Sequence, residues 1–296
     1  MKKKRWGKKH KDNRDWKHYN ERLVKRGEFL VNPRFLDNWR GEIKRMNQGK
    51  VGQPYTYPES LILFCAFFWS KGFDFRAIHG IVRAFSKRLG PFPVICFSQI
   101  RRRILSLPVS FKRRPGRMIV GCDGSGMKAG NRGEWIRQKW RVRRGWIKVV
   151  IMGNTDGDIV DIRIGNEELD ERKAARGMIR KHKNEIEKVL LDGLHDCEDT
   201  FDLCDQCGIE PGIKIRKNAS EKGFGPRPRE VRQYKKKRYK RWVKEKGYGM
   251  RWPASEGIFS AVKRMYGEGI RSHKIRNMYH EAGLKFWAYQ QLRDMA

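Results

Sequence analysis

Apolar residues between positions 59 and 105 recur at the spacing of an α-helix and predict three consecutive helices. The first helix carries a broad apolar face made of Leu61, Ile62, Phe64, Cys65, Phe68 and Trp69. The second, which should end near Gly90, places on one face Phe75, Ile78, Ile81, Val82 and Phe85. The third is expected to begin at Ser98, a good N-cap residue, with Ile100 and Ile104 facing inward.

The third predicted helix also carries three consecutive arginines, Arg101, Arg102 and Arg103. Three short helices with a basic last member suit a helix-turn-helix, whose third element enters a DNA major groove. A plain helical bundle with a solvated basic face explains the same spacing, and both interpretations stay open. Upstream, the pattern indicates a basic arm with a short helix after Asp15, then a linker over residues 49–58.

From Arg117 the pattern changes to that of β-strands. Apolar runs predict strands at Met118–Asp123, Trp146–Gly153 and Asp158–Ile164, with a turn between the last two. The pattern then predicts a helix over Leu169–Val189, a strand over Val189–Asp192, a helix over Cys197–Cys207 and a strand over Ile213–Ile215. Antiparallel strands followed by alternating helices and strands form a mixed sheet with helices on both faces. We therefore expect a ribonuclease-H-like core of the α+β or α/β class.

Residues 214–250 are dense in lysine and arginine, including Lys235 and Lys236, with Tyr234, Tyr239 and Trp242 between them. Such mixing suits phosphate contacts combined with aromatic stacking on nucleic acid. An exposed basic helix whose aromatic side chains face the core fits equally well. The expected organisation is a basic arm and linker over residues 1–57, a helical DNA-binding region over 58–112, and a catalytic domain over 113–296 that includes the basic stretch.

Charge narrows the range of partners. The 296 residues include 68 Lys and Arg against 33 Asp and Glu, a formal net charge of +35 that predicts a polyanionic partner. No apolar run approaches the roughly 18 residues that a membrane-spanning helix needs, so a membrane partner is not expected. The chain shows no secretory signal, and its six cysteines therefore indicate a reducing, cytoplasmic setting. A zinc site formed by Cys197, Cys204, Cys207 and His195 is disfavoured, because their spacing lacks a second close ligand pair.

Three acids are the candidate catalytic residues. Asp123 and Asp192 each follow an apolar strand and precede a glycine, and Glu256 opens an amphipathic helix. Carboxylate oxygens are the ligands that Mg²⁺ and Mn²⁺ prefer, and two such ions can activate the nucleophile and stabilise the leaving oxygen of a phosphodiester. We expect Asp123 to bridge the two ions, with Asp192 and Glu256 each holding one. Asp196 follows the same strand as Asp192 and is its rival.

The chain resembles the DDE transposases of prokaryotic insertion sequences over nearly its whole length. It carries the N-terminal pattern of one subgroup at Trp16, Tyr19, Asn20, Leu23, Val24, Arg26 and Gly27. The first family acid lies in a D-G-[ST]-G element, which matches Asp123–Gly126. The second lies in D-G-x-[YH]-D, which matches Asp192–Asp196, and the third precedes a basic residue by seven positions, as Glu256 precedes Lys263.

The resemblance departs from the family pattern at one place. The family often has an arginine four residues before the glutamate and a tyrosine three residues before that arginine. Trp252 and Gly249 hold those positions here, and Arg251 and Tyr248 each stand one place away. Pro253 lies between Arg251 and Glu256 and can absorb the shift.

The resemblance implies a metal-dependent enzyme that nicks DNA at the element's inverted-repeat ends and joins the freed 3′ hydroxyl to target DNA. It also implies a homodimer in the DNA complex, because two ends need two active sites. Arg101, Arg102, Arg103, Lys235, Lys236, Arg251 and Lys263 are the expected DNA-binding residues. Two rivals remain: a DNA-binding protein without catalysis, such as a decayed transposase acting as a repressor, and a ribonuclease-H-like nuclease that cuts without joining.

Overall fold

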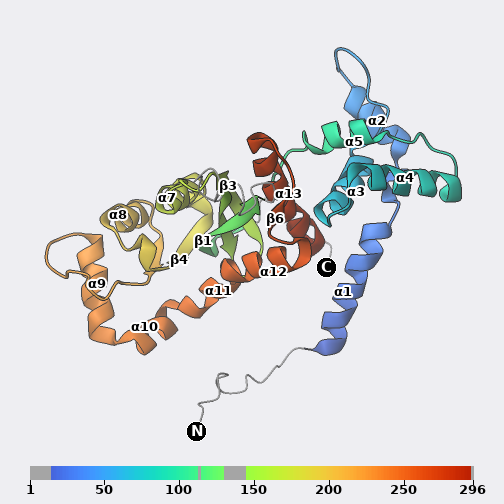
Figure 1. Cartoon of the computed structure of the whole chain (residues 1–296). Helices are drawn as coiled ribbons and strands as arrows, with labels where there is room; N and C mark the ends of the chain where they lie inside the picture. The colour runs from blue at the N-terminus through green and yellow to red at the C-terminus, as the bar shows by residue number, and fades with distance from the viewer. Residues whose placement is uncertain (1–14, 113–114, 130–144, 295–296) are drawn as a thin grey trace, which may run out of the picture.

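The N-terminal third of the chain is helical in a computed structural model that describes residues 15–112, 115–129 and 145–294 (Figure 1). The expected basic arm at residues 1–12 lies outside the described residues. The elements are α1 (Trp16–Val31), η1 (Arg34–Leu36), α2 (Trp39–Asn47), α3 (Glu59–Ser70), α4 (Phe75–Leu89) and α5 (Phe97–Ile104). The three helices predicted between residues 59 and 105 are therefore present. Ser98 does not cap α5, because its first turn already begins at Cys96, whose carbonyl accepts from Ile100 N at 2.9 Å.

A mixed sheet forms the centre of the molecule. Its strands are β1 (Met118–Ala129), β2 (Trp146–Asn154), β3 (Ile159–Gly165), β4 (Ile186–Leu191), β5 (Glu210–Ile213) and β6 (Gly269–Ile270). The order is β3-β2-β1-β4-β5, with antiparallel pairing among β1, β2 and β3 and parallel pairing of β4 and β5; the short β6 pairs with β1. This arrangement confirms the predicted ribonuclease-H-like fold with helices before it.

Helices cover both faces of the sheet because alternate residues of its strands point to opposite sides. On one face Val150 and Met152 of β2 pack with apolar residues of α7 (Glu171–Lys181) and α8 (Glu198–Gln206). On the other, Val149 and Ile151 pack with α12 (Glu256–Tyr266) and α13 (Ile275–Asp294). The helices α3, α4 and α5 join this second cluster, so the N-terminal helices share a core with the sheet.

Several element boundaries differ from the predictions. The strand predicted over Ile213–Ile215 lies instead at Glu210–Ile213, where it pairs with β4. The predicted helix over Leu169–Val189 ends at Lys181, a short 3₁₀ turn follows, and β4 starts at Ile186 because that residue pairs with Met118 of β1. The first strand also runs on past Asp123 to Ala129, since β2 pairs with it as far as Lys128. Asp123 therefore lies inside a long strand and not at its end.

The basic stretch forms α9 (Pro226–Lys237) and α10 (Tyr239–Lys246), at the opposite end of the molecule from α2 and α5 (Figure 1). Its aromatic residues pack on one another: the ring of Trp242, which is 2% exposed, lies 5.0 Å from Tyr234 and 6.3 Å from Tyr239. This packing matches the interpretation in which the aromatics are structural, although Tyr239 stays 46% exposed. The chain then returns through η4 (Tyr248–Met250) and α11 (Arg251–Ala254) to α12 beneath the sheet.

Candidate active site and DNA-binding surfaces

Asp123 is a half-buried carboxylate near the middle of β1. Burial raises its pKa to about 6, and the negative charges of Glu171 and Glu256 act in the same direction. The positive charge of Arg251 opposes this rise in the pKa of Asp123. The site therefore concentrates negative charge around Asp123 and balances it in part with one guanidinium group.

Asp192 follows β4 directly, as the sequence predicted. Gly121 of β1 lies opposite Leu190 of the parallel strand β4. Asp123 and Asp192 each stand two residues beyond this pair along the two neighbouring chain segments. The Asp192 carboxylate accepts a hydrogen bond from Leu194 N at 2.9 Å and so fixes the turn that follows the strand.

Asp196, the alternative to Asp192 as the second acid, is already bound by two arginines. Its buried carboxylate forms an ion pair with Arg227 at 2.7 Å and accepts from Arg216 N at 2.9 Å. A buried charge that is paired and hydrogen-bonded in this way is a structural group. The geometry therefore favours Asp192 over Asp196 as the second acid.

Two glycines determine where the third acid lies. A Cβ atom at Gly121 would lie 3.0 Å from the Cβ of Ala254, and one at Gly153 would overlap the carbonyl oxygen of Ala254. The absence of side chains at these positions lets α11 pack directly against β1 and β2. This close packing brings Arg251, at the start of α11, and Glu256, at the start of α12, to Asp123.

The break between α11 and α12 accounts for the departure from the family spacing. Ser255 has backbone angles of φ −145° and ψ −71°, which end one helix before the next begins. Arg251 forms an ion pair with Glu256 across this break, five residues along the chain, where an unbroken helix would favour three or four. The irregular residue between the two helices is Ser255, whereas Pro253, which the sequence suggested could absorb the shift, lies within α11.

Tyr248 completes the group around Arg251. Burial raises the pKa of Tyr248 to about 12, the charges of Asp192 and Glu256 add to the rise, and Arg251 opposes it. The Arg251 guanidinium lies 5.8 Å from the centre of the Tyr248 ring. Arg251 therefore pairs with Glu256 and interacts electrostatically with Asp123, and Tyr248 interacts electrostatically with Asp192 and Glu256.

Lys263 lies on α12, seven residues beyond Glu256, and its side chain is 30% exposed. Its ammonium group is 3.7 Å from Glu268, a carboxylate that also pairs with Lys128 of β1. Lys263 and Lys128 thus both pair with Glu268.

The donor set suits a hard divalent cation, because carboxylate oxygens are the ligands that Mg²⁺ prefers. Two of these carboxylates, those of Asp123 and Glu256, already interact with the positive charge of Arg251. In the described parts of the chain, no three His, Cys, Asp or Glu residues are already arranged as a metal-binding group. The ion pair with Arg251 explains this at Glu256, whose carboxylate faces the guanidinium.

The structure also places Glu171 near the site, a residue that sequence reasoning did not single out. Its carboxylate lies beside Gly124 and its charge contributes to the raised pKa of Asp123. Glu171 is the first residue of α7, where an acid is common because the helix dipole favours it. Nothing in the sequence distinguished it from other acids at helix starts.

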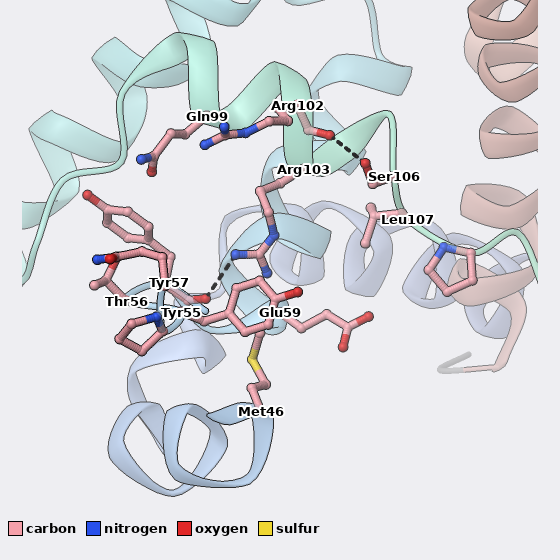
Figure 2. A pocket seen from close by; sticks show the side chains of 13 residues that line it. Met46, Tyr55, Thr56, Tyr57, Glu59, Gln99, Arg102, Arg103, Ser106 and Leu107 are labelled. Atoms are coloured by element: carbon pink, nitrogen blue, oxygen red, sulfur yellow. Dashed lines mark hydrogen bonds between the residues drawn. The ribbon is translucent and has the colours of Figure 1, made fainter. Parts of the chain in front are cut away.

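The arginines of α5 differ in their surroundings. Arg101 and Arg102 are exposed, whereas Arg103 is half-buried, with its guanidinium 4.7 Å from the centre of the Tyr55 ring and 3.5 Å from the carbonyl oxygen of Tyr57 (Figure 2). Arg103 therefore fastens α5 to the segment before α3. Of the three arginines predicted to contact DNA, only Arg101 and Arg102 are thus fully exposed.

Two surface pockets, here called hollows, lie beside α5. One of about 600 Å³ is lined by Arg102, Arg103, Gln99 and the tyrosines at 55 and 57 (Figure 2). The other, of about 620 Å³, lies between α5 and the start of α13 and is lined by Arg101, Arg102, Lys274 and Arg276. Arg102 borders both hollows, so it is the central exposed cation of this surface.

The predicted contacts on α9 are solvent-exposed. Lys236 is exposed, and Lys235 is exposed with its ammonium group 3.8 Å from Glu221. Exposed pairs of this length are weak and are readily exchanged for a phosphate.

Comparisons with known proteins agree with this geometry. A family model described as a transposase DDE domain matches residues 114–290, and a second with the same description matches residues 24–132. A comparison with curated proteins finds no match. Among the helices in the described ranges, none has the length and apolar character needed to cross a bilayer. Because the first match alone covers more than half of the chain and includes Asp123, Asp192 and Glu256, the chain belongs to the DDE transposase family of insertion sequences.

Proposed function

We propose that this transposase nicks DNA at the ends of its element and joins the freed 3′ hydroxyl to target DNA, with Asp123, Asp192 and Glu256 holding two Mg²⁺ or Mn²⁺ ions. The observation that carries the proposal is an electrostatic network in which Arg251 pairs with Glu256 and acts on Asp123, while Asp192 and Glu256 act on Tyr248. Asp123, Asp192 and Glu256 are far apart in the sequence, and a DNA-binding protein without catalysis has no need to bring them into one network.

Such a metal pair activates a water molecule or 3′ hydroxyl and stabilises the leaving oxygen. Asp123, Asp192 and Glu256 would supply the carboxylate oxygens that hold the ions, with Asp123 as the shared ligand. Arg251 balances the carboxylates of Asp123 and Glu256 in the metal-free protein. The Arg251 guanidinium and the Lys263 ammonium group would donate to phosphate oxygens of the DNA.

DNA binds along two basic surfaces in this proposal. One is formed by Arg101 and Arg102 of α5 with the cations at the start of α13, and the other by Lys235 and Lys236 of α9. Because these surfaces lie at opposite ends of the molecule, they would contact separate parts of one terminal inverted repeat or target DNA (Figure 1). Two element ends need two such chains, so the DNA complex is a homodimer, bound to the nucleoid of a prokaryotic cytoplasm.

We assign a separate role to each of three consecutive regions of the chain. Residues 1–57 supply a basic arm and linker, residues 58–112 recognise DNA, and residues 113–296 carry out the chemistry. The shared apolar core between α3 and α13 keeps the second and third parts in fixed register.

The test is a strand-transfer assay with a labelled duplex that carries the inverted repeats flanking the gene, supercoiled target DNA, and Mg²⁺ or Mn²⁺. We expect nicks at the end of the repeat and products in which the labelled end is joined to the target. Nicks without joined products would favour the nuclease alternative. A specific complex with neither product would favour the DNA-binding alternative.

The exposed arginine of α5 provides a test of DNA binding. We expect Arg102→Ala to weaken binding to the inverted repeat several-fold and to reduce the slope of log affinity against log salt by about 1, because one phosphate contact is lost. Fluorescence anisotropy at a series of salt concentrations measures both quantities. Arg180→Ala, at an exposed arginine of α7, is the matched control. Equal losses in both variants would mean that α5 contributes only general charge.

A further inference from the structure

His195 has an unusual environment for a polar residue. Its side chain is buried, and neither ring nitrogen has a hydrogen-bond partner among the residues that the structure describes. Buried imidazole nitrogens without partners are costly, so such a group generally serves a purpose other than stability. His195 ends the short turn that begins after Asp192, and it therefore borders the second candidate metal ligand.

Two acids lie near the His195 ring: the charge of Asp192 acts on it, and Glu171 approaches its Nε2 atom. The distance between His195 Nε2 and Glu171 Oε1 is 4.0 Å, and the Glu171 side chain is only 12% exposed. Lys148 of β2 is its charged partner, with its ammonium nitrogen 3.5 Å from Glu171 Oε2. The carboxylate is thus held between a lysine from the sheet and the imidazole from the turn after β4.

Gly124 lets this carboxylate reach the sheet. A Cβ atom at Gly124 would overlap Glu171 Oε2, so only glycine leaves room for the acid against β1. Because neighbouring residues in a strand point to opposite faces, Glu171 approaches β1 from the side opposite to Asp123. The Glu171 carboxylate consequently lies behind the site, in contact with the neighbours of Asp123 and Asp192.

We infer that Glu171 and His195 form a positioning pair behind the two aspartates, which holds β1 and the turn after Asp192 in register and raises the affinity of the site for a divalent cation. The negative charge of Glu171 attracts the cation without ligating it. His195 ends the turn that follows Asp192 and approaches Glu171, so the position of Glu171 affects the position of that turn. Residues that orient metal ligands in this way typically change metal affinity about 10- to 100-fold when they are replaced.

This inference rests on the proposed function, and its test measures metal binding apart from activity. Binding of Mn²⁺ to the full chain is followed by the electron paramagnetic resonance signal of the free ion. We expect Glu171→Gln, which keeps the shape and removes the charge, to weaken Mn²⁺ binding about tenfold. Glu167→Gln, at an exposed acid just before α7, should leave it unchanged. Thermal unfolding in EDTA shows whether each variant is folded.

Two further variants test the pairing. Gly124→Ala keeps every charge but displaces the carboxylate, so it should weaken Mn²⁺ binding in the same direction even if Glu171→Gln fails to fold. His195→Phe keeps the ring volume, and its effect combined with that of Glu171→Gln should be smaller than the product of the two, because the residues act as one unit. Fully multiplicative effects would contradict the pair.

The outcomes separate this inference from the proposed function. If Asp123→Asn abolishes Mn²⁺ binding while Glu171→Gln and Gly124→Ala stay within twofold of the unchanged protein, the positioning pair is overturned and the metal site stands. If Asp123→Asn binds Mn²⁺ as well as the unchanged protein, the metal site itself is wrong and the inference falls with it.

Discussion

Replacement of Asp123 by asparagine is expected to reduce nicking and strand transfer by about a thousandfold or more while leaving DNA binding intact. The amide keeps the volume of the side chain, so β1 and its pairing with Ile151 should be unaffected. It removes the negative charge that a bridging ligand must carry. Product formation on end-bearing DNA measures the first effect, and anisotropy with the same duplex measures the second.

The matched control is Asp156→Asn, at an exposed acid in the turn between β2 and β3. This variant should retain full activity. Asp192→Asn and Glu256→Gln should behave as Asp123→Asn does, whereas Asp196→Asn should lower stability because Arg227 loses its buried partner. Unchanged cleavage by Asp123→Asn would refute the proposed catalytic role.

Arg251→Ala is expected to reduce strand transfer about 100-fold, because a preorganised donor to the phosphate is lost. Arg251→Lys should restore little of it, since an ammonium group cannot make the paired contacts of a guanidinium. Arg264→Ala, at an exposed arginine on α12, is the control and should stay active. Full activity of Arg251→Ala would show that the ion pair with Glu256 is only structural.

The same variant should change how stability depends on pH. The pKa of Asp123 in the folded protein is about 6 against an ordinary value of 3.8, so the folded state binds more protons between these values and loses stability as the pH rises through them. Arg251 lowers this pKa. In Arg251→Ala the pKa should rise further and the loss should extend above pH 6. Melting temperatures in EDTA from pH 5 to pH 8 measure the difference.

Local patterns were sufficient for most elements of this fold. Helical spacing located α3 and α4, and apolar runs located β2 and β3, because these segments bury one face or a whole strand in a simple way. The end of α7 was missed because residues 182–189 contain both polar and apolar positions that fit a helix. The pairing of Ile186 with β1 determines where β4 begins, and pairing between distant segments leaves no signal in the local sequence.

The candidate site, like the fold, could be predicted only in part from local sequence patterns. The acids themselves stood out as Asp-Gly pairs after apolar runs and as a glutamate at the start of an amphipathic helix. The positions of Arg251 and Tyr248 could not be settled from spacing, because Ser255 interrupts the helix and changes which residues share a face. Glu171 was missed altogether, since its proximity to Asp123 depends on the packing of α7 across Gly124.

By itself, the sequence determined the basic character of the protein, the order of its helices and strands, and the identity of three acids suited to divalent metal ions. Only the tertiary structure decided that Arg251, Tyr248 and Glu171 lie around those acids, that Asp196 is held by Arg227, and that Arg103 binds its own chain. The reason is physical. Periodicity and charge are properties of neighbouring residues, whereas the surroundings of a side chain depend on which distant segments pack against it.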